Sequence, residues 1–353
     1  MKKTQVALAA MALVASTAVL AEVKVSGQFD LGVGRSTGVG GSFMEQGGWA
    51  DNSHIKFSGS EDLGNGLKAG FTLEGGFTQN GNPGNGGNGT LFSRESTVNL
   101  SGDFGGVRLG QQVSPYIVTH AITQAGTPGS FWVNRIIMGG GLGAAAIGQG
   151  NGAFQTGGFF IANAISYTTP NISGWTATVL TNTENGAKDG AMATSTSSGD
   201  KYSAFNVIGA IGPINVSGGY QNRSGQYTSY VIGGTTTFGD LTVGFNHSSH
   251  KPETGATTAG QPGVKTATSM ISANYKLQEK LSLNAGIAQN DLATEQTLSS
   301  VGLKYDLSAR TYTYVAYLNA SNGAQSSLAN RGNYNRTSTT DISTTMVGIA
   351  HSF

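Results

Sequence analysis

Apolar and polar residues alternate along much of this chain with a period of two. Residues 23–33, VKVSGQFDLGV, place Phe29 and Leu31 on one parity and Gln28 and Asp30 on the other. The same alternation recurs in LKAGFTLEGGF, LTVGFNHS, LSLNAGI and the closing VGIAHSF. Successive side chains of a strand point to opposite faces, so this pattern predicts long strands with one apolar and one polar face.

The connections between these strands fall into two classes of length. Short turns such as EDLGNG, FGD and LSAR alternate with longer Gly-, Asn- and Ser-rich stretches, of which the longest lies between Gln112 and Phe160. Counting strands between the connections gives about sixteen, and single-chain bacterial barrels have an even number. The sequence therefore predicts an all-β fold, a 16-stranded antiparallel transmembrane β-barrel with short periplasmic turns and long external loops. The predicted strands are 23–35, 51–60, 67–78, 92–102, 106–113, 161–169, 174–183, 201–211, 214–222, 229–238, 241–250, 267–277, 281–290, 298–307, 311–320 and 343–353.

The N-terminal residues predict an export signal, and the composition argues against several functional classes. Lys2 and Lys3 precede an apolar run that ends in small residues, which predicts a secretory signal peptide at residues 1–21 and one barrel domain at 22–353. Beyond that run, no apolar stretch approaches the roughly 18–20 residues of a spanning helix. A mean hydropathy of −0.13 is compatible with a barrel wall that is only half apolar. The net charge of +1 and the lack of a basic run give no case for nucleic acid.

Other classes remain as alternatives. A soluble β-sandwich, β-helix or adhesin would also alternate, but the polar face here is mostly Thr, Ser, Asn and Gly, which suits a water-filled lumen. The five histidines include none in a G-x-S-x-G motif, so no enzyme is predicted. His247 and His250 lie three apart and point to opposite faces of a strand, which favours a solvated loop over a metal site. No cofactor is implied.

Several motifs in order resemble the Gram-negative general porins of the betaproteobacterial type. They are SGSEDLGNGLKAGFTLEGGF, SRESTVNLSGDFGGVRLGQQVSP, ISYTTPNISGWTAT, LKYDLSARTYTYVAYLNAS and VGIAHSF. The resemblance implies a homotrimer in the outer membrane, a third loop (residues 114–160) folded into the lumen, and passive diffusion of ions and small hydrophilic solutes. Phe353, with His351 and Ile349 before it, resembles the signal that the barrel assembly machinery recognises. Lipid and lipopolysaccharide are the expected surroundings.

The resemblance also implies a pore constriction in which arginines of the wall face acidic residues of the third loop. Arg94 occupies the place of a wall arginine, while His54, Gln111 and Gln28 stand where basic residues are common. Arg135 lies in the third loop.

This chain departs from the family pattern because Ser114 to Phe160 contains no Asp or Glu. The acidic half of the constriction is then missing or supplied from elsewhere. With Arg94 and Arg135 unpaired, we expect a weak transverse field and a lean towards anions. His54 could strengthen this preference in mildly acid water. The alternative function is a substrate-specific porin for a neutral or weakly polar small solute.

Overall fold

One antiparallel sheet holds seventeen strands in the residues that the computed structural model describes, which are 23–37, 42–44, 53–77, 91–126, 159–183, 201–225, 227–253, 265–291, 295, 297–321 and 341–353. The first nine strands are β1 (Lys24–Ser36), β2 (Ser42–Met44), β3 (His54–Gly64), β4 (Leu67–Gly76), β5 (Glu95–Gly102), β6 (Gly105–Val113), β7 (Phe160–Thr168), β8 (Thr176–Asn182) and β9 (Tyr202–Ile211). The others are β10 (Ile214–Arg223), β11 (Tyr227–Phe238), β12 (Leu241–Pro252), β13 (Thr266–Gln278), β14 (Leu281–Asn290), β15 (Thr297–Asp306), β16 (Thr311–Ala320) and β17 (Ile342–Ser352).

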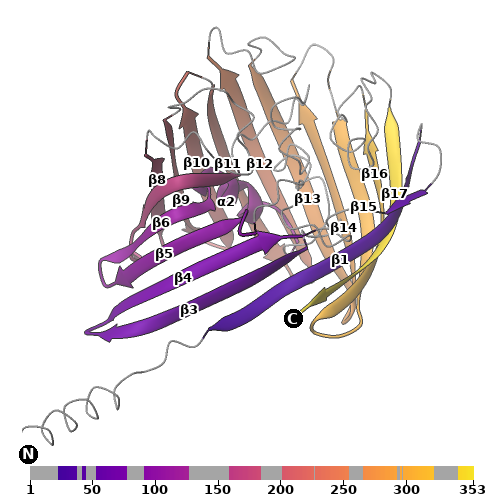
Figure 1. Ribbon diagram of the computed structural model, residues 1–353. Helices are drawn as coiled ribbons and strands as arrows, with labels where there is room; N and C mark the ends of the chain where they lie inside the picture. The colour runs from indigo at the N-terminus through magenta and orange to yellow at the C-terminus, as the bar shows by residue number, and fades with distance from the viewer. Residues whose placement is uncertain are drawn as a thin grey trace, which may run out of the picture.

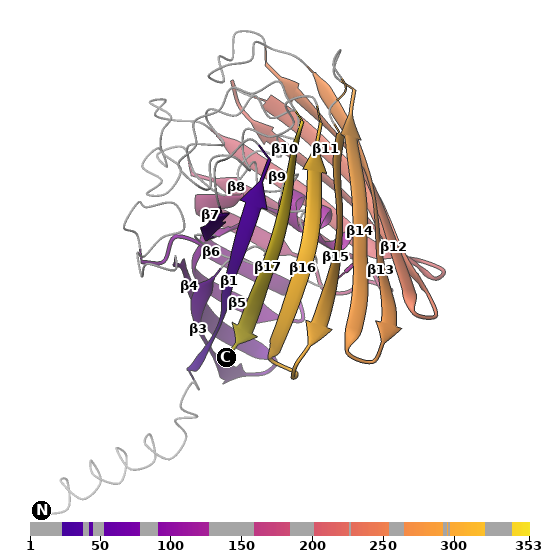
Figure 2. The same ribbon diagram turned by 90° about the vertical axis from the view of Figure 1, so that its right-hand side faces the viewer.

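The sheet closes into a barrel because β1 pairs with both β3 and β17 (Figures 1 and 2). From β3 to β17 each strand pairs antiparallel with the next one in sequence. The closing register sets Phe29 opposite His351 and Leu31 opposite Ile349. The predicted 16-stranded barrel is confirmed, with strand ends displaced by a few residues. β2 is an addition that the alternation did not predict, and its three residues pair with the end of β1.

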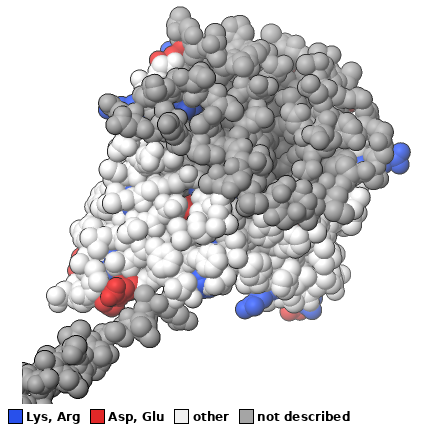
Figure 3. Space-filling model, in the orientation of Figure 1, with Lys and Arg blue, Asp and Glu red and all other residues white. Residues whose placement is uncertain are grey.

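The period of two divides each wall strand between an apolar outer face and a more polar inner face. Val347 and Ile349 on β17 are 58% and 48% exposed, whereas Asn246 on β12 and Asp30 on β1 are fully buried inside. Between the rims, the outer wall in view in Figure 3 is largely uncharged, and acidic and basic atoms gather at its lower rim. Such a band is what hydrocarbon requires of a spanning strand.

Helix α2 (Pro115–Ile122) follows β6 and lies inside the ring, against β9, β10 and β11 (Figure 1). The local sequence explains where it begins. Ser114 is extended and its Oγ accepts a hydrogen bond from the Tyr116 N–H at 3.2 Å, while Pro115 occupies the first helical position. Across the described residues, we find no helix whose length and apolar character would let it span a membrane.

Candidate functional site: a charged row inside the barrel

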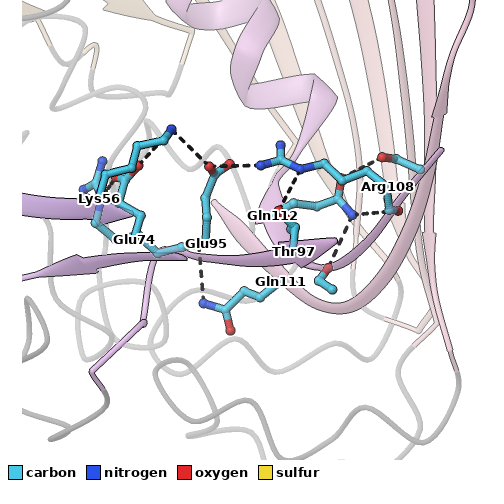
Figure 4. Close-up of polar contacts among 10 residues, drawn as sticks. Lys56, Glu74, Glu95, Thr97, Arg108, Gln111 and Gln112 are labelled. Carbon is cyan, nitrogen blue, oxygen red and sulfur yellow. Dashed lines mark hydrogen bonds and ion pairs between the residues drawn. The ribbon is translucent and has the colours of Figure 1, made fainter. Parts of the chain in front are cut away.

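Five charged residues lie side by side where β3, β4, β5 and β6 face the lumen. They are Lys56, Glu74, Arg94, Glu95 and Arg108, here called the charge row (Figure 4). The strand register brings them together, because Lys56 stands opposite Glu74 and Glu74 stands opposite Glu95. Four consecutive strands therefore supply one continuous polar network.

Each carboxylate of the row is held by two cations. Lys56 Nζ lies 3.4 Å from Glu74 Oε2 and 3.6 Å from Glu95 Oε2. Arg108 Nη2 donates to Glu95 Oε2 at 3.1 Å, and its Nε donates to Thr97 Oγ1 at 3.1 Å. Two carboxylates on directly opposite residues repel each other, so Lys56 between them offsets that repulsion.

The cations of the row are more accessible than its carboxylates. The side chains of Lys56 and Arg108 are 35% and 32% exposed, whereas those of Glu74 and Glu95 are 9% and 10% exposed. The row contains three cations and two carboxylates, so it carries an excess of one positive charge. The ammonium group of Lys56 and the guanidinium group of Arg108 therefore belong to more exposed side chains than the two carboxylates do.

Arg94 is paired, which corrects the expectation of an unpaired arginine. Its Nε donates to Glu74 Oε1, and its guanidinium carbon lies 5.2 Å from the centre of the Phe160 ring. Arg94 lies at a bend before β5 begins, where its N–H donates to the Glu74 carbonyl at 3.0 Å. The alternation of β5 therefore does not govern its direction. The acidic partner comes from the wall strands, not from the third loop.

Gln28 and His54 share the inner face with Lys56. They are directly opposite each other in the β1–β3 register, and Gln28 Nε2 donates to the Tyr312 hydroxyl at 3.3 Å. Their role in the constriction stays a prediction, as does that of Arg94. Arg135 lies outside the described residues.

Gln111 is on the other side of the wall, which corrects its expected place in the constriction. Its side chain points away from Glu95 across β5, and its Nε2 donates to the Ser93 carbonyl (Figure 4). Gln111 and Arg108 are an odd number of residues apart on one strand, so they point to opposite faces. The β6–β7 pairing also skips Gln111 at an irregularity between Gly110 and Gln112.

Four residues of the charge row were not predicted from the sequence to be site residues: Lys56, Glu74, Glu95 and Arg108. A signal for one pair was present, because the short turn after β3 fixes the register that sets Lys56 opposite Glu74. The pairing of Glu74 with Glu95 depends on the long connection between β4 and β5, for which no such rule exists.

The chain end completes the pairing of β17 with β1 that closes the barrel. Phe353 and Gly27 exchange two backbone hydrogen bonds, of 3.0 and 3.1 Å. His351 Nδ1 and Thr311 Oγ1 lie 2.8 Å apart, and Ile349 is half exposed on the outer face. The outward parity of Ile349, His351 and Phe353 is therefore as the sequence indicates, while their role in assembly stays a prediction.

Neutral hydrogen bonds hold α2 and the residues just after it to the inner faces of β9, β10, β12 and β13. Thr119 Oγ1 lies 3.0 Å from Ser217 Oγ, and Gly219 leaves the space that Thr119 fills, since a Cβ there would come within 2.8 Å of Thr119 Oγ1. The other bonds run from Asn206 Nδ2 to the Pro115 carbonyl (3.0 Å), from Asn246 Nδ2 to Thr123 Oγ1 (3.2 Å) and from Ala125 N to Ser272 Oγ (2.9 Å).

His120, in the last turn of α2, is buried in its neutral form. It is 0% exposed, its ring lies 4.9 Å from that of Tyr116, and neither ring nitrogen has a hydrogen-bond partner in the described structure. Burial lowers the pKa of His120 to about 3. Burial also raises the pKa of Tyr116, with a further contribution from Tyr227. Charging the imidazole therefore opposes the packing of α2.

Comparison with known sequences places the chain near outer membrane proteins. The family model described as Gram-negative porin matches residues 7–325. Outer membrane porin protein 32 of Delftia acidovorans is 36% identical over 184 residues, which cover 50% of this chain and 48% of that protein. An outer membrane porin of Bordetella pertussis is 31% identical over 197 residues, 50% of this chain and 46% of the relative. The matches thus span about half the length of these curated relatives.

Comparison with solved structures covers nearly the whole chain. The anion-selective porin from Comamonas acidovorans has a TM-score of 0.72 at 24% identity, and covers 94% of this chain and 100% of that one. The trimer form of OmpT from Vibrio cholerae has a TM-score of 0.65 at 12% identity, with 94% and 99% covered. At these identities the likeness establishes a shared fold.

Proposed function

Because the chain belongs to the Gram-negative porin family, we propose that it forms a water-filled channel through which ions and small hydrophilic solutes diffuse passively, with a weak preference for anions. Its location is the outer membrane of a Gram-negative bacterium. A barrel of sixteen strands is wide enough for an aqueous lumen, which is the physical basis of passive diffusion.

The charge row is the observation that supports the anion preference. Its exposed groups are Lys56 and Arg108, while Glu74 and Glu95 are nearly covered. Charges that line a narrow pore with low-dielectric walls act strongly on a passing ion. Because Arg94 is neutralised by Glu74, the preference is weaker than an unpaired arginine would give.

Assembly and export belong to the same proposal. We propose that the protein forms a homotrimer. The support is the shared fold with Vibrio cholerae OmpT, for which a trimer form is described. Residues 1–21 act as the export signal, residues 22–353 form the channel, and residues 114–160 form the loop that narrows it. The family and the fold are those of channels, and we assign the protein no enzymatic activity.

Reversal potentials in a planar bilayer test the function. Under a tenfold gradient of potassium chloride, the proposal expects stable single-channel steps and a reversal potential of the sign given by chloride permeating faster than potassium. Clear cation preference would contradict the anion preference, and absence of channel activity would contradict the function itself. A trimer band in mild detergent that is lost on heating tests the assembly.

A further inference from the structure

An apolar patch faces the lumen beside the charge row, where a general aqueous pore would carry polar groups. The patch consists of Val113 at the end of β6, Val118 of α2, Leu180 of β8 and Ile208 of β9. These residues are part of the lining of a cavity of about 580 Å³. That volume is in the range of small-molecule sites.

The lining of the cavity also includes polar residues, among them part of the charge row. Arg108 and Glu95 both line it. Arg108 donates through Nε to Thr97 and through Nη2 to Glu95, and the described contacts leave the rest of its five N–H donors for a ligand. Because 32% of its side chain is exposed, the guanidinium can receive a carboxylate from the lumen.

Asn206 adds an unused acceptor to the same cavity. It is 2% exposed, and its Nδ2 donates to the Pro115 carbonyl at 3.0 Å. Its Oδ1 has no hydrogen-bond partner within the described residues. A buried amide oxygen without a donor is costly, so this position favours a ligand or water that donates to it.

We propose that this cavity, called the lumenal niche, is a binding subsite for small organic monocarboxylates that carry an apolar body and a hydroxyl group. The carboxylate pairs with Arg108, the apolar body lies on Val118 and Ile208, and the hydroxyl donates to Asn206 Oδ1. The inference rests on the proposed channel function, since solutes reach the niche through the lumen.

The composition of the niche disfavours other solute classes. A sugar would place its hydroxyl groups against aliphatic side chains, which cannot form hydrogen bonds with them. An inorganic anion would contact Arg108 but would make no apolar contact with the valine, leucine and isoleucine side chains. A dianion would place its second charge near the Glu95 carboxylate. A monoanion with an apolar body uses both the polar and the apolar residues of the lining.

Block of single-channel current tests the proposal, with 4-hydroxybenzoate as the probe. It has the carboxylate, the apolar ring and the hydroxyl, so it is expected to reduce the current of the full-length channel saturably. Neutral 4-hydroxybenzamide is expected to bind at least about tenfold more weakly, because it lacks the charge-assisted bond to Arg108. Benzoate, without the hydroxyl, is expected to bind several-fold more weakly.

Three variants locate the subsite. Val118→Thr keeps the shape of the side chain and is expected to weaken block about threefold or more, because the apolar surface becomes polar. Arg108→Gln is expected to weaken block about tenfold or more. Lys56→Gln removes the same charge from the same row, and Lys56 does not line the cavity. This variant therefore controls for the general loss of positive potential, and it is expected to weaken block less than Arg108→Gln.

The outcomes separate the niche from the channel function. Normal conductance with no saturable block, or with block equal in Val118→Thr and the native protein, overturns the niche and leaves the channel function standing. If no conductance is found, the channel function fails, and equilibrium dialysis of 4-hydroxybenzoate against detergent-solubilised trimers decides the niche. Saturable binding that is weaker in Val118→Thr supports the niche. Binding that is absent, or that is unchanged in Val118→Thr, overturns the niche.

Discussion

The inner wall at β3–β6 and the inner wall at β9–β13 are both polar, yet they use different chemistry. The first carries the charge row, whose cations remain partly exposed to the lumen. The second carries Asn206, Ser217, Asn246 and Ser272, which bond to α2 and the residues just after it and are buried. Burying a charged group costs several kcal/mol, whereas burying a neutral polar group costs little when it forms a hydrogen bond.

The comparison indicates a division of labour. Under the proposed function, the charged wall supplies the field that acts on a permeating ion, while the neutral wall fixes the position of α2 without adding a field of its own. Changes to the neutral wall should therefore alter gating and conductance, and changes to the charged wall should alter ion preference.

Acid should loosen the neutral wall through His120. Its pKa is about 3 in the packed loop and 6.5 when exposed, so an exposed imidazole binds a proton more readily between these values. Anchoring is complete above pH 6.5 and is lost as the pH falls towards 3, at up to about 1.4 kcal/mol for each pH unit. We expect more frequent channel closures at pH 4 than at pH 7 in bilayer recordings.

The variant His120→Leu should show no increase in channel closures at pH 4, because leucine cannot bind a proton. The substitution should not disturb α2 at pH 7, because neither ring nitrogen of His120 has a described hydrogen-bond partner to lose. His247→Leu serves as a control, since that histidine is bonded to Ser269 on β13, away from α2, and should leave the acid response intact. An acid response in His120→Leu equal to that of the native channel would contradict the assignment.

Filling the space between α2 and β10 should displace α2 at neutral pH. A Cβ on Gly219 would come within 2.8 Å of Thr119 Oγ1 and 3.2 Å of Thr119 Cβ. Gly219→Val should therefore cost about 1–3 kcal/mol of anchoring and change the single-channel conductance. The neighbouring Gly218→Val is the matched control, because the nearest atom to its Cβ is 4.0 Å away. Equal conductance in the two variants would show that α2 does not depend on this contact.

Removing one carboxylate from the charged wall should raise anion preference. Glu74→Gln leaves Arg94 without its ion-pair partner and reduces the pairing of Lys56. An added unit charge near the ion path is worth about 1 kcal/mol, so the chloride-to-potassium permeability ratio should rise about fivefold. Glu61→Gln removes the same charge at the turn end of β3, outside the row, and should leave the reversal potential nearly unchanged. A fall in the ratio for Glu74→Gln would contradict the proposed field.

Much of the fold was predictable because one rule governs a barrel wall. The outward side chains must suit hydrocarbon, so the parity of residues such as Phe29, Leu31 and Ile349 reports the face directly. Short turns then fix the register of each hairpin. β2 was not predictable, since its three residues follow β1 through a connection that carries no alternation.

The candidate site was less predictable because its geometry departs from that rule at two places. Arg94 lies at a bend ahead of β5, so its parity gave no direction, and its pairing with Glu74 depends on the path between β4 and β5. Gln111 was placed by the resemblance of its motif to a family pattern, although its odd spacing from Arg108 indicates the opposite face. Where parity and motif disagree inside a strand, parity was the better guide.

The smallest effect is expected for arginine substitutions at Gln111 and Gln28. Gln111→Arg adds a positive charge on the outer side of β6, where the structure places the side chain beside the Ser93 carbonyl. Gln28→Arg adds the same charge on the inner face, opposite His54. We expect Gln28→Arg to shift the reversal potential towards anions, while Gln111→Arg leaves it unchanged because the wall separates the charge from the lumen. A shift in Gln111→Arg as large as that in Gln28→Arg would return Gln111 to the constriction.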